Sequence, residues 1–498
     1  MEHALALDQG TSATKALIVR ADGVVAASAV CPLRSFHPKP DYVEQDAEEI
    51  LASSLTAVKN AVSEFEGQGH KKTEIVCAGI SNQRESFLIW DKSGKALTPV
   101  IVWQDKRASG LCESLAAQGL EARVNAVTGL RLDPYFSGGK LRFLMENGFL
   151  AENGMGGLGG FFGTIDSFLL FKLCAGSPHL SDYTNASRTL LMDIDALRWD
   201  ASMRSLFCAG KFSMAELRPS ASFFGKSDFG GVFSTPVPIT ACIGDSHAAA
   251  FGEGCFYPGT VKATMGTGSS VMFNTGKRVQ SSQGLVSAIC WSMEGRVDYA
   301  LEGVIVSCAS TLNWALDVLK LADSPAALDD LAESAGGSEG VTLIPAFSGL
   351  GAPYWQMSRR AEILGLTFGT TAAHIARAAL EAYPFQLKDV LDAMKTGTGT
   401  KPEWIRADGG LTNSRFSMNL IARLLRLEVR VDNRREISAL GAALLAFLGN
   451  GTLSFSDIER AVMAAPFSGI SAWDNGVMDT SLQTAYSLWS KRVSMPHE

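Results

Sequence analysis

The stretch "ALALDQGTSATKALIV", residues 4–19, decides the fold class of this chain. A short apolar run leads into the polar turn "QGTSAT" and then into a second apolar run, which predicts a strand, a turn and a strand. The stretch "TVKATMGTGSSVMFNTG", residues 260–276, repeats this order about half the chain later. We therefore predict two related α/β domains, residues 1–250 and 251–498, with a ligand in the cleft between them.

The residues after the first hairpin continue the α/β pattern. "VVAASAV" predicts a third strand, and "DAEEILASSLTAVKNAVSEF", residues 46–65, predicts a helix. Asp46 is its predicted N-cap, and Glu49 three residues later has the spacing of a capping box. "EIVCAGIS", residues 74–81, predicts a buried strand.

Bulk composition excludes several classes of protein. The 498 residues are 46% hydrophobic and 19% charged, with a net charge of −7, so nucleic acid and anionic membranes are unexpected partners. The start lacks a signal peptide, and no apolar run is long enough to span a bilayer. The nine cysteines form no C-x-x-C pair, which predicts neither a cysteine zinc cluster nor a disulfide framework, and favours a soluble cytoplasmic protein.

Three turns have the composition of a phosphate site. "DQGTSATK", from Asp8 to Lys15, offers backbone N–H groups, hydroxyls and a lysine around one turn. Asp8 at its start could hold Mg²⁺, because hard cations prefer oxygen ligands. "MGTGSS", residues 265–270, and "ADGGLTNS", residues 407–414, are two further turns of this kind. A plain hairpin turn explains the first of them equally well, and each turn is a weak signal alone, but the three together favour a nucleotide held across a cleft.

Two other phosphate-binding patterns are rejected. "GMGGLG", residues 154–159, matches G-x-G-x-x-G but follows no strand and opens no helix, so we interpret it as a surface loop. The chain contains no Walker-type G-x-x-x-x-G-K-[ST] sequence.

The stretch "IGDSHAAAFGEG", residues 243–254, places Asp245, Ser246 and His247 side by side. Three consecutive side chains diverge on either a strand or a helix, so they cannot form a hydrolytic triad. Asp245 follows the apolar run "PITACI", where a strand end would bring its carboxylate to the cleft. The alternative is a helix N-cap role for Asp245, and His247 is predicted to be structural.

With these features in place, the chain resembles the FGGY family of carbohydrate kinases and is most similar to its glycerol kinase branch. The stretches that carry the resemblance run from residue 4 to about residue 450. They are "ALDQGTSATKA", "HPKPDYVEQDAEEI", "GISNQRES", "IVWQDKR", "TGLRLDPYFSGGKL", "FGTIDSFLL", "DYTNASRTLL", "FSGLGAPYW", "AEILGLTFGTTAAHIARAALE" and "ADGG".

The resemblance implies a fold of two actin-like ATPase domains, of the ribonuclease H-like type, with an interdomain cleft. It implies phosphorylation of a primary hydroxyl of a small polyol by ATP with Mg²⁺, as from glycerol to glycerol 3-phosphate. Asp245 would be the general base, because a carboxylate can accept the proton of the attacking hydroxyl. The implied sites are, for the polyol, Arg84, Glu85, Trp103, Tyr135, Asp245, Ser246 and Ser270; for ATP, Thr11, Ser12, Ala13, Lys15, Gly266, Thr267, Gly268, Gly409, Gly410 and Asn413; and for the metal, Asp8 and Asp245.

Several positions depart from the glycerol kinase pattern. Ser246 replaces the usual Gln and Ser270 replaces the usual aromatic residue, so the pocket would be larger and wetter at one end. The substrate could then be a longer polyol, such as a tetritol, or a ketose. Lys15 replaces an Arg that is frequent there, and Pro236 stands where some relatives bind fructose 1,6-bisphosphate with an Arg.

Three functional hypotheses follow from these sequences. The first is a polyol kinase, the second a pentulose kinase such as one for xylulose, and the third an actin-like nucleotide-binding protein without sugar turnover. "NQRES" favours the glycerol branch over the pentulose branch, and Asp245 with Arg84 and Trp103 argues against the third. The resemblance also leaves room for a homo-oligomer.

Overall fold

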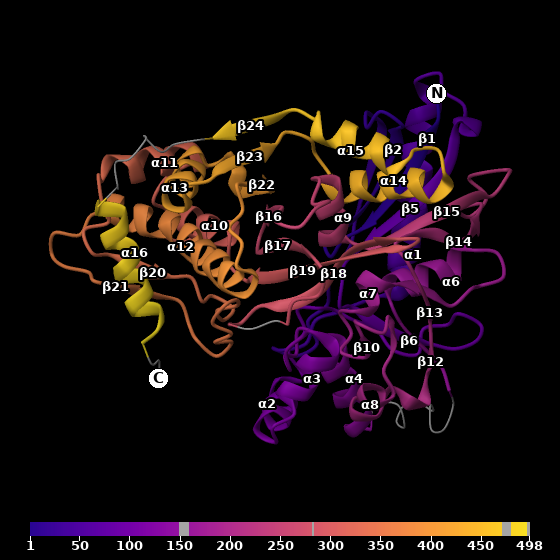
Figure 1. Ribbon diagram of the computed structural model, residues 1–498, viewed down its shortest axis with the longest axis horizontal. Helices are drawn as coiled ribbons and strands as arrows, with labels where there is room; N and C mark the ends of the chain where they lie inside the picture. Colours follow the sequence, from indigo (N-terminus) through magenta and orange to yellow (C-terminus); the bar gives the residue numbers. More distant parts are fainter. Residues whose placement is uncertain (149–158, 281–282, 471–479, 496–498) are drawn as a thin grey trace.

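One mixed sheet runs through the whole molecule in the computed structural model, which describes residues 1–148, 159–280, 283–470 and 480–495 (Figure 1). Thirteen strands of the described residues form it. Their order is β24 (Phe467–Ile470), β23 (Glu428–Asp432), β22 (Trp404–Asp408), β16 (Val261–Met265), β17 (Ser269–Gly276), β19 (Arg296–Ile305), β18 (Val286–Met293), β14 (Ala221–Ser227), β15 (Val237–Gly244), β5 (Ile75–Asn82), β1 (His3–Gln9), β2 (Ala13–Arg20) and β3 (Val25–Pro32).

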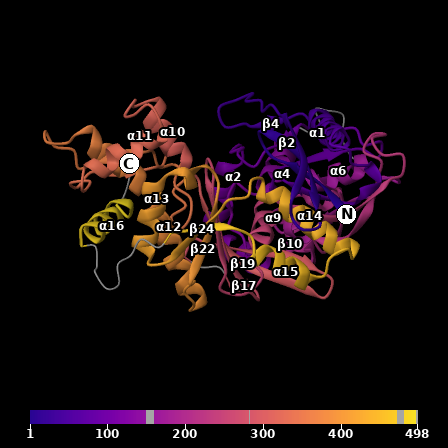
Figure 2. The ribbon, with the colours of Figure 1, turned by 90° about the horizontal axis from the view of Figure 1, so that it is seen from above.

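Both predicted hairpins are present. β1 pairs with β2 antiparallel up to Gln9↔Thr14, and β16 pairs with β17 antiparallel up to Met265↔Ser269. Figure 1 shows β1 and β2 beside the N-terminus and β16 and β17 near the middle of the molecule, and Figure 2 shows β2 and β17 apart from above. The boundary between residues 250 and 251 stays a prediction.

The predicted helix after the first hairpin is α1 (Ala47–Gly67). Asp46 is its N-cap, and its carboxylate accepts from the N–H groups of Glu48 and Glu49. The capping box is wrong, because the Glu49 carboxylate accepts from the backbone and guanidinium N–H groups of Arg34 instead. A charged partner on the neighbouring segment therefore replaces the local backbone partner.

The two faces of β1 explain its apolar sequence. Leu5 and Leu7 pack in the core beneath α1, whereas Ala4 and Ala6 point to the opposite face and pack in the core beneath α14 (Ile437–Asn450). A strand buried on both faces reads as a continuous apolar run, and the small alanines let the helix approach closely. Helix α14 thus lies over N-terminal strands although it is near the end of the chain (Figure 1).

The remaining elements cover the sheet and extend both lobes. A five-stranded sheet has the order β12 (Ser213–Met214), β8 (Phe161–Thr164), β6 (Phe87–Trp90), β7 (Val100–Ile101) and β4 (Glu44–Gln45). Short strand pairs are β10 (Met192–Asp193) with β11 (Arg198–Trp199), β9 (Leu180–Asp182) with β13 (Glu216–Arg218), and β20 (Thr342–Ile344) with β21 (Glu362–Leu364). The other helices are α2 (Ser109–Ala117), α3 (Glu121–Thr128), α4 (Ser137–Glu146), α6 (Ile165–Leu173), α7 (Tyr183–Ala186), α8 (Ala201–Leu206), α9 (Asp245–Gly252), α10 (Ala309–Asp317), α11 (Pro325–Ser334), α12 (Ala372–Thr398), α13 (Arg415–Leu425), α15 (Phe455–Met463) and α16 (Thr480–Val493).

Two further sequence predictions concern a loop and membrane-spanning segments. The "GMGGLG" stretch, which we interpret as a surface loop, lies outside the described residues except for Gly159. Among the helices that the structure describes, none has both the length and the apolar character needed to cross a membrane.

The contact between β5 and α14 gives a stability test. A Cβ added at Gly79 would lie 2.3 Å from the backbone oxygen of Ala442, so Gly79→Ala must push the helix away from the sheet. We expect a loss of roughly 1–3 kcal/mol in the free energy of unfolding, measured by chemical denaturation. Gly110→Ala in α2 is the matched control, because its Cβ would meet no atom within 4 Å. Equal stability of the two variants would contradict the close packing.

Candidate active site

Asp245 lies where two neighbouring parallel strands end. β15 ends at Gly244 and α9 begins at Asp245, while the adjacent β5 leads directly to Arg84. Arg84 Nε lies 3.3 Å from Asp245 Oδ1. The Arg84 side chain is 4% exposed, whereas the Asp245 side chain is 36% exposed. The carboxylate is therefore oriented by a buried cation and still open to a ligand, as expected for the end of a strand in an α/β fold.

Helix α9 does not use Asp245 as its N-cap. The cap is Gly244, and a Cβ at this position would lie 2.7 Å from the Arg84 side chain. Glycine is therefore needed for Arg84 to pass close to the strand end. The alternative in which Asp245 is the N-cap is wrong, and the Asp245 carboxylate accepts from the adjacent N–H of Ser246 at 2.6 Å.

His247 is buried and contacts the site through Arg84, and its structural role stays a prediction. Its Nδ1 lies 3.2 Å from the carbonyl oxygen of Cys290, and its Nε2 lies 3.2 Å from Arg84 Nη1. A carbonyl can only accept and a guanidinium can only donate, so Nδ1 carries the proton and Nε2 accepts. Burial and the nearby Arg84 hold the pKa of His247 well below its usual value, which agrees with a neutral ring. The three neighbours Asp245, Ser246 and His247 form no triad.

A buried ion network surrounds Arg84. Arg84 Nη1 lies 3.0 Å from Glu302 Oε1 on β19, and Arg188 Nη1 lies 2.6 Å from Glu302 Oε2. Arg188 Nε also donates to Glu85 Oε1 at 2.5 Å. Burial would raise the pKa of Glu302, but Arg188 and Arg84 outweigh burial and hold it well below its usual value. Two carboxylates and two guanidinium groups thus balance one another in the interior.

Arg188 and Glu302 are functional candidates that the sequence predictions missed. Each is fully buried although it is charged, and each stands in an apolar or weakly polar run, "NASRTLL" and "YALEGVIV". A lone charge in such a run is the signal that could have identified them, because a buried charge needs a partner. The partner itself could not be identified from sequence.

Ser270 joins this network in a way that the sequence did not predict. Its hydroxyl donates to Glu302 Oε1 at 2.8 Å, and the residue is 9% exposed. The Ser270 hydroxyl, expected to make the pocket wetter, is therefore bound to a buried carboxylate. Ser246 is partly exposed beside Asp245.

Glu85 has an unusual backbone conformation for its residue type. Its φ is +62°, in the left-handed region, and it is 1% exposed. Such strain persists only where surrounding contacts fix it, and it is common at functional sites. Here the Ser137 hydroxyl donates to the Glu85 carbonyl at 2.7 Å while Arg188 holds the carboxylate.

Trp103 and Tyr135 form an aromatic wall next to the ion network. Their ring centroids are 5.5 Å apart in an edge-to-face arrangement, and Trp103 Nε1 donates to Thr11 Oγ1 at 2.9 Å. The ammonium of buried Lys140 donates to the carbonyls of Val102 and Tyr135, both at 3.1 Å. Burial lowers the pKa of Lys140 to about 8. Lys140 therefore fixes the backbone on both sides of the wall.

Asp8 is buried at the end of β1. It accepts from the Ser81 hydroxyl at 2.5 Å. Burial raises its pKa to about 6, and the nearby charges of Asp245 and Glu436 add to the rise. Lys15 forms an ion pair with Glu436 from the C-terminal half. A carboxylate that is costly to ionise and lies near other carboxylates is a fitting ligand for a cation.

A cleft of 860 Å³ adjoins Asp8 and Lys15. Its lining includes three of the predicted nucleotide residues of the C-terminal half, Gly409, Gly410 and Asn413. It also includes residues that the sequence predictions missed, among them Arg415, Arg434 and Arg435. Four carboxylates, those of Asp8, Asp408, Asp432 and Glu436, line the same cleft, so its cations and acids are equal in number.

The other predicted nucleotide residues are not among the described residues that line this cleft, and each has another place. Thr11 lies against Trp103, Ser12 is exposed, and Ala13 starts β2. Gly266, Thr267 and Gly268 form the tip of the second hairpin. The carbonyls of Gly266 and Thr267 accept from N–H groups at the start of α10.

Gly409 connects the cleft with the second hairpin. It has a φ of +95°, and a Cβ there would lie 2.6 Å from the carbonyl of Met265. The turn after β22 can therefore lie directly against the hairpin because it begins with glycine. This contact places the two C-terminal turns side by side, although they are about 140 residues apart in sequence.

Family models that match both halves of the chain define the class of protein. The N-terminal domain model of the FGGY family of carbohydrate kinases matches residues 3–252, and the C-terminal domain model matches residues 261–449. The chain belongs to this family. The predicted fold class, with actin-like ATPase domains, and the predicted kinase class are confirmed.

Individual relatives point to one branch. The chain is 40% identical to glycerol kinase 1 of Thermotoga maritima over 462 residues, which are 92% of each chain. The crystal structure of Plasmodium falciparum glycerol kinase with ADP matches with a TM-score of 0.88 and 32% identity, covering 99% of this chain and 98% of that one. A xylulose kinase from Lactobacillus acidophilus, with a TM-score of 0.87, 20% identity, and 99% and 98% coverage, shows the shared fold alone.

The raised pKa of Asp8 gives a pH-dependent stability test. The pKa of Asp8 is about 6 in the folded protein, against an ordinary value of 3.8. Between these two pH values the unfolded chain ionises Asp8 more easily than the folded protein does, so the folded protein loses stability as the pH rises. Asp8→Asn removes this cost, so without Mg²⁺ at pH 7.5 we expect the variant to be more stable by up to about 3 kcal/mol. The difference should shrink to near zero below pH 4, as measured by thermal unfolding.

The matched control for this test is Asp317→Asn, at the exposed end of α10. It should leave stability unchanged across the same pH range. A less stable Asp8→Asn variant at pH 7.5 would contradict a costly buried carboxylate.

Proposed function

We propose that this chain transfers the γ-phosphoryl group of ATP to a primary hydroxyl of glycerol, giving glycerol 3-phosphate and ADP. The observation that carries the proposal is the Asp245 carboxylate, held by Arg84 and open to a ligand at the end of β15. The sequence relatives that match it over most of its length are glycerol kinases.

Asp245 is the proposed general base. It accepts the proton of the glycerol hydroxyl as the oxygen attacks the γ-phosphorus, and the bond to the β–γ bridging oxygen breaks. The contact with Arg84 directs the carboxylate into the open side of the site. The N–H groups of Arg84 can also donate hydrogen bonds to a hydroxyl oxygen of glycerol.

The aromatic wall is the proposed cover for the carbon chain of glycerol. Trp103 and Tyr135 present ring surface and one phenolic hydroxyl beside Glu85. Excluding water from this pocket favours transfer to glycerol over hydrolysis of ATP. Ser246 and Ser270 complete the proposed polyol site, with Ser270 acting through Glu302.

The cleft next to Asp8 is the proposed place of ATP. Gly409, Gly410 and Asn413 lie in its lining together with Lys15. Thr11, Ser12, Ala13, Gly266, Thr267 and Gly268 remain proposed phosphate contacts at the two hairpin tips.

Asp8, with Asp245, is the proposed holder of Mg²⁺, and its raised pKa agrees with a ligand that a cation would keep ionised. When bound, Mg²⁺ supplies positive charge against the transferring phosphoryl group. Cytoplasmic location and a homo-oligomeric state stay predictions from the sequence.

A longer polyol or a ketose is the second candidate substrate. The small side chains of Ser246 and Ser270 favour it, because they leave room where the glycerol kinase pattern has a long amide and an aromatic ring. This candidate shares the same base and the same donor, so only the acceptor distinguishes it.

Substitution of the base gives a direct test. Asp245→Asn keeps the size of the side chain and should lower kcat by about 10²–10⁴-fold while ATP affinity, measured by calorimetry, stays near the wild-type value. Asp317→Asn is the control and should retain full kcat. Wild-type kcat in Asp245→Asn would remove Asp245 from the proton transfer.

An acceptor panel separates the two substrate candidates. ADP release should be measured with glycerol, C4 and C5 polyols, and pentuloses, and we expect the highest kcat/KM with glycerol. A tetritol or a ketose with the higher kcat/KM would favour the second candidate. Nucleotide hydrolysis without any acceptor preference would contradict the kinase proposal.

A further inference from the structure

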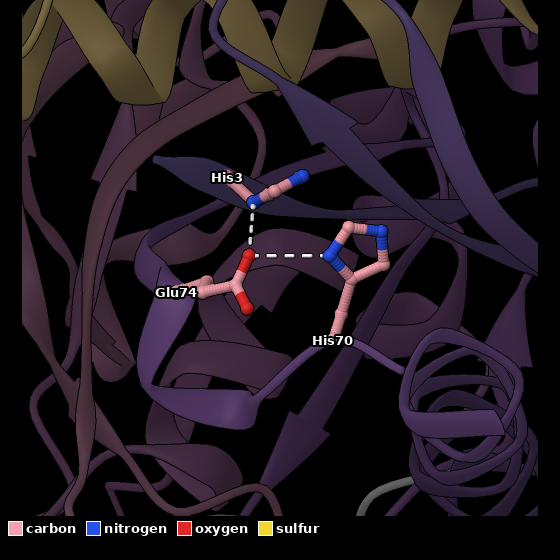
Figure 3. A group of neighbouring side chains, drawn as sticks. All are labelled: His3, His70 and Glu74. Atoms are coloured by element: carbon pink, nitrogen blue, oxygen red, sulfur yellow. Dashed lines mark hydrogen bonds and ion pairs between the residues drawn. The ribbon is translucent and has the colours of Figure 1, made fainter. Parts of the chain in front are cut away.

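Three potential metal ligands meet at the start of the first strand, away from the cleft. His3 begins β1, and His70 lies after the end of α1. Glu74 ends a short 3₁₀ turn, Lys72–Glu74, which precedes β5. One ligand atom from each lies within 4.8 Å of the other two. Figure 3 shows the Glu74 carboxylate between the two imidazole rings, with one oxygen directed toward both.

Neither ring nitrogen of His3 makes a hydrogen bond of normal geometry among the described residues, and the Met1 backbone is at most a weak contact. His3 is 1% exposed, and both of its ring nitrogens are buried. Its Nδ1 lies 3.7 Å from Glu74 Oε2, which is too long for a hydrogen bond. An unsatisfied buried imidazole is costly, so an unseen partner is the simplest explanation.

Glu74 and His70 are already oriented for this partner. The N–H of Lys71 donates to Glu74 Oε1 at 2.8 Å, which leaves Oε2 for His70 Nδ1 at 3.2 Å. The His70 ring stacks on Phe65 with centroids 4.4 Å apart. Such outer contacts fix the direction of metal ligands.

Spacing and ligand type select the metal. Ligand atoms around tetrahedral Zn²⁺ lie about 3.3 Å apart when each bond is about 2.0–2.1 Å. The two distances to Glu74 Oε2, 3.2 and 3.7 Å, are close to this value, and the imidazole nitrogens of His3 and His70 lie within 4.8 Å of each other, so binding would draw them closer. Two imidazoles and one carboxylate suit Zn²⁺ better than Mg²⁺.

We propose that His3, His70 and Glu74 bind one Zn²⁺ ion, with water from the exposed side as the fourth ligand. The site is structural. His3 and Asp8 are five residues apart on one strand, roughly 17 Å, so the ion would lie outside the proposed catalytic cleft. β1 and β5 pair in parallel from His3↔Ile75 onward. The ion would therefore link the segment between α1 and β5 to His3, the first residue of β1.

Zinc binding to the full chain tests this proposal. Chelator-treated protein is dialysed against Zn²⁺ alone, and bound metal is counted by elemental analysis. We expect one Zn²⁺ per wild-type chain and at least a tenfold weaker affinity in both His70→Asn and Glu74→Gln, whose side chains are partly exposed. His37→Asn, at an exposed histidine elsewhere, is the matched control and should bind as wild type.

Two further arms separate this site from the proposed Mg²⁺ site. Asp8→Asn should still bind one Zn²⁺, and Zn²⁺ should raise the thermal unfolding midpoint of the wild type but not of Glu74→Gln. With glycerol and MgATP, kcat of His70→Asn should equal that of the wild type. Wild-type zinc binding by His70→Asn and Glu74→Gln, loss of zinc in Asp8→Asn, or no binding by the wild type would overturn the proposal.

Discussion

The ionised carboxylate of Glu302 is the constraint on which the site depends. It lies on β19 of the C-terminal half, and its two guanidinium partners, Arg84 and Arg188, come from the N-terminal half. Removing one partner of a buried ion pair leaves a charge without compensation, at a cost of about 3–5 kcal/mol. The need to neutralise the buried Glu302 carboxylate holds Arg84 in place, and Arg84 in turn orients Asp245. The position of the proposed base therefore follows from a charge balance that spans both halves.

Asp8 shows the opposite arrangement, because its charge has too little compensation. It is buried, it lies near Asp245 and Glu436, and the Lys15 ammonium, which lowers its pKa, is also engaged by Glu436. The free protein bears this cost at neutral pH, and a bound cation would remove it. Stability and the proposed Mg²⁺ site therefore make opposing demands on this one residue, as is usual where a site is arranged for a ligand.

Close backbone contacts at glycines bring the turns of the site together. Gly244 lets Arg84 cross the end of β15, and Gly409 lets the turn after β22 lie on the second hairpin. Gly79 lets α14 lie on the N-terminal strands. Each contact joins segments that are distant in the chain, and a side chain at any of the three would separate them.

The sequence by itself determined the local elements and, through the family resemblance, the class of reaction. The sequence predicts the two hairpins, α1 with its Asp46 N-cap, and the strand end before Asp245. These features are predictable because the alternation of apolar and polar residues and helix capping both depend on residues a few positions apart. Only the tertiary structure decided that Glu49 binds Arg34, that Ser270 binds Glu302, and that Arg188 completes the ion network. It also brought His3 next to His70 and Glu74. These partners are from 15 to 114 residues apart, and no local pattern encodes such pairs, because they form only when the strands and helices pack.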